Sequence, residues 1–323
     1  MNLIKELSRG NKIALARAIS KVENQEDGYE ELLKETYLHT GNAYYLGITG
    51  PPGAGKSTLV DCLARRLAGK NKRVGIIAVD PTSPFSGGAL LGDRIRMSSL
   101  ATNPSIFIRS MASRGSLGGI ARATKDVAVL MDAFGMNYII IETIGVGQVE
   151  IDIADACDST VLVLVPESGD AIQVMKAGLI EIADIIVVNK ADREGAEKLV
   201  RELKTISELR EKKNLWEYPV LMTEALYEKG LDQLVDAIFQ HEQFLKKSGE
   251  FLKHRKERLK RQICNLIEER IWSCMKSKFL ESNALDLMVD RIFKKELSPI
   301  EAVDRIMMSK EIFNQGVKKR WKR

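Results

Sequence analysis

Residues 47–58 read GITGPPGAGKST, and within them Gly50, Gly55, Lys56 and Ser57 fit the pattern GxxxxGK[ST]. An apolar run precedes this segment and a helical pattern follows it, which is the strand–loop–helix context that the pattern requires. Glycines let the backbone N–H groups of such a loop turn towards phosphate oxygens, and the N-terminus of the next helix also faces the anion. We expect Lys56 to reach the β- and γ-phosphates and the Ser57 hydroxyl to bind Mg²⁺. The sequence therefore predicts a P-loop that binds a nucleoside triphosphate.

Short β-branched runs alternate with longer helical stretches from Tyr44 to residue 240. Most of the runs are continuously apolar, which indicates a sheet that helices cover on both faces. The succession of strand and helix predicts right-handed βαβ units. The expected fold class is α/β, a P-loop NTPase with a mostly parallel sheet. The predicted strands are residues 44–50, 73–80, 105–110, 137–143, 159–166, 183–189 and 218–223.

A second motif, VVNKAD at residues 187–192, follows one of these apolar runs and ends in NKxD. The Asp192 carboxylate can accept hydrogen bonds from N1–H and the exocyclic amine of guanine, whereas adenine would leave it unpaired at a cost. Lys190 is expected along the plane of the base, and Asn189 is expected to tie this loop to the P-loop. The predicted nucleotide is therefore GTP or GDP. Further contacts to the base, from backbone N–H groups to guanine O6, are expected at Thr223, Glu224 and Ala225.

Three carboxylates stand in loops or strand ends at the expected C-terminal edge of the sheet, where parallel sheets bind ligands. Asp80 and Glu142 end two apolar runs, and Asp93 lies in a loop between them. Each carboxylate alone could cap a helix, but the three together favour a role with Mg²⁺. Gly145 completes an ExxG turn, whose N–H is expected to sense the γ-phosphate. The predicted metal ligands are Ser57, Asp80, Asp93 and Glu142, and the predicted catalytic residues are Lys56, Asp80, Asp93 and Glu142.

Helical patterns without strands flank the predicted sheet. Residues 1–45 read as two polar helices, and residues 250–280 carry apolar side chains mostly three or four positions apart, as in a long amphipathic helix. We therefore divide the chain into three parts. They are an N-terminal helical arm (1–45), a P-loop GTPase domain (46–240) and a C-terminal helical dimerisation region (241–323).

Composition narrows the class of protein. With 45% hydrophobic and 29% charged residues the chain is typical of a globular protein. No apolar stretch reaches the roughly 18 residues of a membrane span, and the four cysteines lack metal-binding spacing, so we expect a cytoplasmic protein without a membrane partner. The positive charge gathers after residue 241, which we interpret as the solvated surface of long helices rather than a nucleic-acid site. The scattered His39, His241 and His254 are interpreted as surface or packing residues.

Several long segments resemble the MeaB/ArgK-type GTPases, which are chaperones of adenosylcobalamin-dependent methylmalonyl-CoA mutase and related acyl-CoA mutases. The resemblance runs from residue 10 to residue 240 and is weaker in the helical tail. It rests on GITGPPGAGKSTL, AVDPTSPFSGGALLGDRIRM, SLGGIARAT, IIETIGVGQVE, SGDAIQVMKAGLIEIADIIVVNKAD and the leading ALARAI.

The resemblance implies a Mg²⁺-dependent GTPase that gates cofactor loading and protection of such a mutase, with the adenosyltransferase as a further candidate partner. It implies that residues 168–178 form an additional switch that transmits the nucleotide state to the mutase. The C-terminal helices are implied to form a homodimer. The residues implied to hold GTP are Gly53, Ala54, Gly55, Lys56, Ser57 and Thr58 at the phosphates and Asn189, Lys190 and Asp192 at guanine.

Hydrolysis by the free chain is expected to be slow. Val146 follows Gly145 where a glutamine often orients the attacking water, and Gln148 comes two positions later. A partner that orders residues 81–97, 143–150 and 168–178 is expected to complete the catalyst.

Three other functional classes are less well supported by the sequence. A metallochaperone similar to the nickel-insertion GTPases would need His- or Cys-rich tracts, and the sequence has none. A P-loop kinase would need a second substrate pocket, and no motif indicates one. A nucleic-acid-binding module would have to be built on the basic tail, which ends in KKRWKR.

Overall fold

The computed structural model describes residues 3–80, 100, 102–112, 122–143, 149–168, 178–209, 216–276 and 283–308. The chain divides into two compact units, Met1–His254 and Arg255–Arg323. The first unit holds the sheet and the second holds the C-terminal helices.

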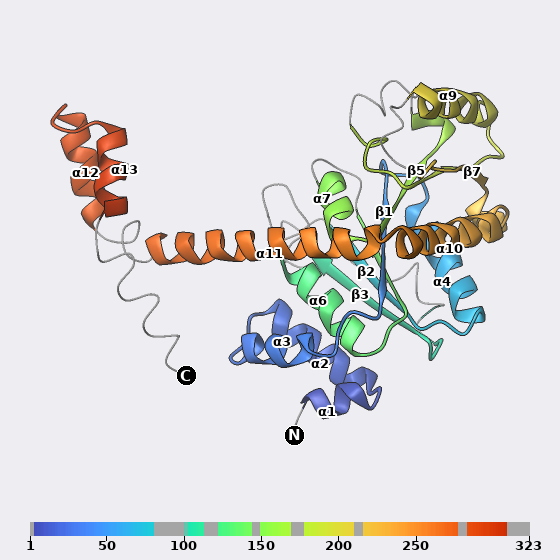
Figure 1. The fold of residues 1–323 in the computed structure, drawn as a ribbon, viewed down its shortest axis with the longest axis horizontal. Coiled ribbons are helices and arrows are strands. Elements are labelled where there is room, and N and C mark those ends of the chain that lie inside the picture. The colour runs from blue at the N-terminus through green and yellow to red at the C-terminus, as the bar shows by residue number, and fades with distance from the viewer. Residues whose placement is uncertain are drawn as a thin grey trace. The chain divides into compact units, whose positions relative to one another are not determined.

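The described part of the first unit is built on one seven-stranded sheet, and all its neighbouring strands are parallel. The strand order is β3-β2-β4-β1-β5-β6-β7, so β1 lies at the centre between β4 and β5. Figure 1 shows this sheet with helices beside it. This arrangement confirms the predicted α/β class with a parallel sheet. Each strand overlaps a predicted apolar run: β1 Tyr44–Thr49, β2 Val74–Asp80, β3 Ile106–Ala112, β4 Tyr138–Glu142, β5 Ser159–Leu164, β6 Ile185–Asn189 and β7 Val220–Thr223.

Alternate side chains of the strands pack against helices on opposite faces of the sheet. The register partners Ile76 and Ile140 lie in a core that also holds residues of α4 (Lys56–Gly69) and α10 (Leu231–Ser248). The next pair, Ile77 and Ile141, lies in a core with residues of α2 (Lys12–Glu23) and α6 (Arg122–Ala133). Both faces are buried, which explains why the strands are continuously apolar. Further described helices of this unit are α1 (Leu3–Ser8), α3 (Tyr29–Tyr37), α7 (Val149–Ala156), α9 (Ala196–Leu209), η2 (Pro166–Ser168) and η3 (Ala225–Tyr227).

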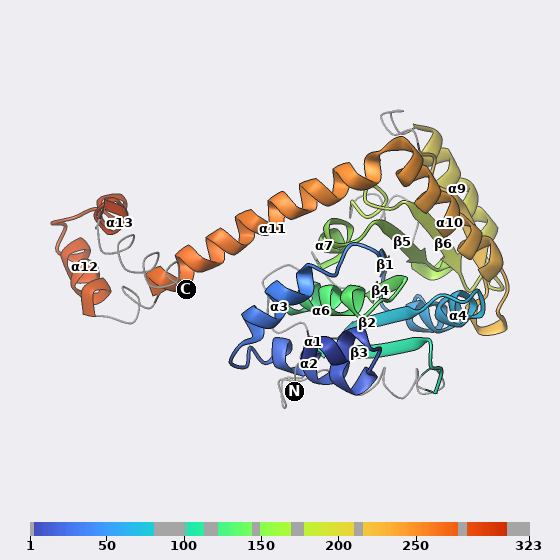
Figure 2. The same cartoon turned by 60° about the horizontal axis from the view of Figure 1, so that its bottom comes forward.

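The N-terminal arm packs on α6, as Figure 2 shows, and belongs to the first unit. The buried carboxylate of Asp132 on α6 accepts hydrogen bonds from the N–H groups of Gly41, Asn42 and Ala43, at 2.8, 3.1 and 3.0 Å. It also accepts one from the Tyr45 hydroxyl at 3.1 Å. One side chain thus anchors the segment that leads from the arm into β1.

The first unit extends beyond residue 240, where the sequence placed the start of the C-terminal region. His241 on α10 is only 2% exposed, its Nδ1 is hydrogen-bonded to the Ser159 hydroxyl, and its ring packs on Trp216. Phe251, at the start of the next helix, stacks on Tyr44 with the ring centroids 6.3 Å apart. Residues 241–254 therefore lie in the first unit, and His241 is a packing residue as expected.

The second unit consists, in its described part, of most of α11 (Glu250–Met275) followed by α12 (Asn283–Phe293) and α13 (Pro299–Met308). Ser298 caps α13: its hydroxyl accepts from the Glu301 N–H at 3.2 Å, and the Glu301 carboxylate accepts from the Ser298 N–H at 2.9 Å. Within the described helices, none is long and apolar enough to cross a membrane.

Candidate nucleotide-binding site

The P-loop backbone requires glycine at two of the positions that the motif names. Gly50 has φ 137°, and a Cβ there would lie 2.0 Å from the carbonyl oxygen of Val163 on the neighbouring strand. Gly55 has φ 87°, and a Cβ there would lie 2.5 Å from Asn189 Nδ2. Both conformations are ones that residues with side chains rarely adopt. The loop between β1 and α4 can therefore approach its neighbours this closely only with glycine at these positions.

Lys56 turns its ammonium group back over the loop. The side chain is only 6% exposed, and Nζ donates hydrogen bonds to the carbonyl oxygens of Gly50 at 2.8 Å and Pro51 at 3.0 Å. The cation is thus held at the mouth of the loop by two carbonyl dipoles. A phosphate group bound by the loop would meet a fixed positive charge there.

Two of the four predicted metal ligands meet beside the P-loop. The Ser57 hydroxyl, in the first turn of α4, donates to Oε1 of the buried Glu142 at 2.7 Å. Glu142 ends β4 and is the register partner of Ile48 on the central strand, which brings its carboxylate to the loop. A hydroxyl and a carboxylate are oxygen donors of the kind that Mg²⁺ prefers, so these two residues fit a magnesium ion.

The other predicted ligands are placed less completely. The Asp80 backbone ends β2, which neighbours β4, but the Asp80 side chain lies outside the described residues. Asp93, Gly145 and most of the three predicted switch segments also lie outside them. Among the residues that the structure does describe, no group of three or more His, Cys, Asp and Glu side chains could hold a metal ion.

The side chain of Asn189 joins three loops. Its Nδ2 donates to the carbonyl oxygen of Ala54 in the P-loop at 2.9 Å. Its Oδ1 accepts from the Thr223 hydroxyl at 3.0 Å and from the Ala225 N–H at 3.1 Å. The link from this loop to the P-loop that the sequence predicts for Asn189 is therefore present. A second link comes from the next residue, Lys190, whose Nζ donates to the carbonyl oxygen of Gly53 at 2.7 Å.

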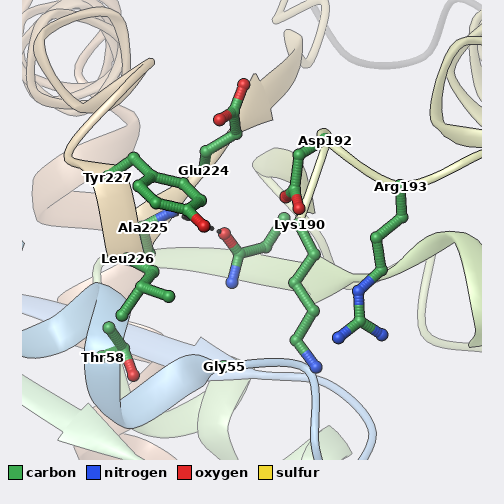
Figure 3. Close-up of a pocket in the computed structure, with 10 residues that line it drawn as sticks. Gly55, Thr58, Lys190, Asp192, Arg193, Glu224, Ala225, Leu226 and Tyr227 are labelled. Carbon is green, nitrogen blue, oxygen red and sulfur yellow. Dashed lines mark hydrogen bonds between the residues drawn. The ribbon is translucent and has the colours of Figure 1, made fainter.

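A cavity of about 330 Å³ opens between these loops, a size within the range of small-ligand sites. In Figure 3, Lys190, Asp192 and Arg193 lie on one side of the cavity, and Leu226 and Tyr227 lie on the other. The cavity thus has a polar side that carries the predicted guanine-reading carboxylate and an apolar side opposite it. The lining residues are Gly55, Thr58, Asn189, Lys190, Asp192, Arg193, Glu224, Ala225, Leu226 and Tyr227.

The turn Thr223-Glu224-Ala225 supports the pocket in ways that its sequence does not reveal. Thr223 is buried, and its hydroxyl donates to the side chain of Asn189, which lines the cavity. The Ala225 N–H donates to Asn189 and the Glu224 N–H donates to the carbonyl oxygen of Lys229 at 3.1 Å. These N–H groups already hold the turn together, so the contact from this turn to guanine O6 stays a prediction.

Sequence reasoning missed three lining residues, Arg193, Leu226 and Tyr227. Arg193 and Leu226 directly follow recognised motifs and Tyr227 comes one position later, and this proximity is the only signal of their role in the sequence. The Arg193 guanidinium pairs with Glu167, which follows β5. Leu226 and Tyr227 are 77% and 62% exposed, and both line the cavity, so a ligand in the cavity would cover them.

Comparisons with known proteins agree with this geometry. A family model described as methylmalonyl-CoA mutase-associated GTPase MeaB matches residues 15–279. A protein of Pyrococcus abyssi that carries the name of a GTPase is 46% identical over 98% of this chain and 97% of its own length. The mouse methylmalonic aciduria type A homolog, a mitochondrial protein, is 34% identical over 93% of this chain and 77% of its own. Among solved structures, an LAO/AO transport system kinase superposes with a TM-score of 0.72 at 26% identity, covering 94% of this chain and 95% of that one.

Proposed function

The chain belongs to the MeaB family of GTPases and is a GTP hydrolase, and we propose that it serves an adenosylcobalamin-dependent acyl-CoA mutase of the methylmalonyl-CoA mutase type. In this proposal, hydrolysis of Mg²⁺-bound GTP to GDP and phosphate gates cofactor loading and protects the mutase. The support for the partner is the family description, which names association with that mutase, together with the mouse relative.

One observation carries the guanine assignment. The Asn189 amide joins the P-loop, the NKAD loop and the turn after β7, so these three segments form one rigid frame around the cavity. These bonds support the proposal because they hold the NKAD loop, which carries Asp192, next to the P-loop, which carries Lys56. A nucleotide whose phosphates lie in the P-loop presents its base to Asp192, whose carboxylate accepts from guanine N1–H and the exocyclic amine.

The phosphates bind to the backbone of residues 53–55, to Lys56 and to the first turn of α4. Ser57 and Glu142 hold Mg²⁺, which neutralises charge on the β- and γ-phosphates when it is bound. As the sequence predicts, Asp80 and Asp93 would also bind this ion and Gly145 would sense the γ-phosphate. Thr58 lines the cavity and belongs to the residues that would bind the phosphates.

The second unit forms the homodimer interface. Its described helices expose large apolar side chains that a folded monomer would leave in water. Hydrophobic burial between two copies is the simplest way to cover them, and most oligomers of soluble proteins are symmetric pairs of this kind. The exposed residues are Leu259, Ile263, Ile267, Ile271, Trp272, Leu287, Val289, Phe293, Ile300 and Val303.

Single-turnover GTP hydrolysis, with and without an adenosylcobalamin-dependent acyl-CoA mutase, tests the proposed partner. The free chain is expected to be slow and the complex faster, because the mutase orders residues 81–97, 143–150 and 168–178. The variant Lys56→Ala, mixed with the same mutase, is the control for contaminating hydrolases. Equal rates with and without the mutase would contradict the proposal. The adenosyltransferase, as a further candidate partner, is tested by adding it to the same assay.

A further inference from the structure

Residues 224–229, here called the bracket loop, connect β7 to α10 and are closed at their base. The Glu224 N–H donates to the Lys229 carbonyl at 3.1 Å, and the Lys229 N–H donates back to the Glu224 carbonyl at 3.3 Å. The side chains of the same two residues form an ion pair, with Lys229 Nζ 2.9 Å from Glu224 Oε2. Backbone and side chains therefore join the two ends of the loop at the same place.

The path of the bracket loop between these ends is tightly constrained. Tyr227 N–H donates to the Glu224 carbonyl at 2.9 Å, Glu228 has a left-handed φ of 57°, and Arg66 on α4 donates to the Glu228 carbonyl at 3.1 Å. Gly230, the next residue, has φ 75°, and a Cβ there would lie 2.2 Å from the Met222 carbonyl. The loop is thus held on its outer side by α4, while the ion pair holds its base.

The tip of the bracket loop carries Leu226 and Tyr227, which form the apolar side of the cavity opposite Asp192 (Figure 3). Lys229 Nζ also lies 5.8 Å from the centroid of the Tyr227 ring. A purine has polar edges and apolar faces. In the proposed complex, Asp192 is suited to a polar edge of the purine, and the apolar side chains of Leu226 and Tyr227 are suited to a face.

We infer that the Glu224–Lys229 ion pair is a positioning element for the base: it holds the bracket loop so that Leu226 and Tyr227 cover one face of the bound purine. This inference rests on the proposed GTP site. It assigns a role to Glu224 that differs from a direct contact with the base. The carboxylate of Glu224 binds Lys229, and the side chains of Leu226 and Tyr227 contact the ligand.

The positive charge of Lys229 also affects the balance of charge at the cavity. Glu224 and Asp192 both line the cavity, so two carboxylates stand at one site. The hydrogen bond with Glu224 raises the pKa of Lys229, and the Asp192 carboxylate adds to that rise. The Lys229 cation therefore neutralises Glu224 and leaves Asp192 as the carboxylate that reads the base. Removal of Lys229 alone would leave the Glu224 carboxylate without its ion-pair partner at the cavity.

Binding of GDP to three variants of the full chain tests the inference by a double-mutant cycle. Lys229→Gln is expected to weaken GDP binding by about fivefold at low salt, the upper end of what an exposed ion pair contributes. Glu224→Gln is expected to weaken GDP binding by less, because this variant breaks the ion pair without leaving an unpaired carboxylate at the cavity. The double variant should bind GDP more tightly than Lys229→Gln alone. The loss in Lys229→Gln should also shrink at high salt, since salt screens the exposed charge.

Leu226→Ala tests the apolar side of the cavity and is expected to weaken GDP binding by about fivefold to tenfold, because the base loses an apolar contact. Leu38→Ala, which trims an equally exposed leucine on the N-terminal arm, is the matched control. Glu197→Gln, which breaks an exposed ion pair with Arg201 on α9, is the control for the charge change. The inhibition constant of inorganic tripolyphosphate against a fluorescent GDP should be unchanged in Leu226→Ala and in the double variant, which both keep the net charge, because only the base contacts the bracket loop.

The possible results distinguish a failure of this inference from a failure of the proposed GTP site. An equal affinity for GDP in wild type, Lys229→Gln and Leu226→Ala, with the preference for GDP over ADP intact, overturns the inference and leaves the GTP site standing. A double variant that binds GDP more weakly than either single variant, or a parallel loss of tripolyphosphate binding, also overturns it, because either result points to a general structural defect. If the wild-type chain binds ADP as tightly as GDP, the proposed GTP site itself is wrong.

Discussion

The side-chain amide of Asn189 donates a hydrogen bond to the carbonyl oxygen of Ala54, 2.9 Å away and 135 residues earlier in the chain. This one contact joins the loop that reads the base to the loop that binds the phosphates. It is buried, since Asn189 is among the most buried polar residues of the first unit. Together with the bond from Lys190 to Gly53, it connects the loop predicted to read the base with the loop predicted to bind the phosphates.

Asn189→Ala should lower both stability and nucleotide affinity. The substitution leaves the buried Thr223 hydroxyl and the Ala225 N–H without their common acceptor, at a cost of about 1–3 kcal/mol for each buried group. Urea unfolding and calorimetry with GDP measure the two effects. Thr223→Val is the matched control, because it removes one of the three bonds and should cost about 1 kcal/mol. Equal stability of Asn189→Ala and wild type would show that the three loops are held by other contacts.

Asp192→Asn should change which base is bound. The Asn amide has one acceptor and one donor in place of two carboxylate acceptors, so the hydrogen bond from the guanine exocyclic amine is lost, which is worth about 1–3 kcal/mol when the alternative is an unpaired buried group. Xanthosine triphosphate presents an acceptor at the same edge and should bind the variant better than the wild type. Calorimetry with GTP, xanthosine triphosphate and ATP tests this. Wild-type binding of ATP as tight as that of GTP would make the base assignment wrong.

Lys56→Ala should abolish hydrolysis and strongly weaken binding of the triphosphate. The ammonium group contributes charge to the phosphates and, apart from two carbonyl contacts, little packing, so the circular dichroism spectrum should not change. Lys70→Ala, at the C-terminal end of the same helix, is the control for loss of a lysine from α4. Full turnover by Lys56→Ala would remove this residue from the site.

Stability should fall as the pH drops below neutral because of His241. Burial, with a smaller effect of His254, lowers the pKa of His241 from 6.5 to about 4. The unfolded chain therefore binds a proton near pH 6.5 that the folded chain does not accept until about pH 4, so the folded state loses stability between these values. The loss between pH 7 and pH 5 should be about 1–3 kcal/mol. Urea titrations at both pH values measure it, and His241→Gln should remove this part of the pH dependence.

A chain that ends after His254 should be monomeric and should still bind GTP. It keeps Phe251, which stacks on Tyr44 in the first unit, and it loses the exposed apolar residues of the second unit. Sedimentation velocity across micromolar concentrations compares it with the full chain, which is expected to be a dimer. Ile267→Glu in the full chain should weaken the dimer without truncation, because it places a charge among those apolar residues. A full-length chain that stays monomeric would rule out the dimer.

Much of the site could be predicted because its signals are local. The glycines of GITGPPGAGKST are required by the backbone of one loop, and the NKAD tetrapeptide ends one strand, so each motif can be read from a few adjacent residues. The seven apolar runs predict the strands for the same reason: a strand buried on both faces must be apolar throughout. The place of Glu142 beside Ser57 also follows, because neighbouring parallel strands bring their C-terminal ends to one edge.

The sequence by itself determined the α/β class, the strands of the sheet, the P-loop and the guanine-reading motif, since backbone conformation and burial on both faces leave periodic and short-range patterns. Only the tertiary structure decided which distant groups meet. Three features depend on the strand order β3-β2-β4-β1-β5-β6-β7 and on how the helices pack on the sheet. They are the hydrogen bond from Asn189 to Ala54, the packing of His241, and the apolar side of the cavity at Leu226 and Tyr227. A contact between residues a hundred positions apart costs chain entropy, which the assembled core offsets. A short stretch of sequence therefore does not predict such a contact.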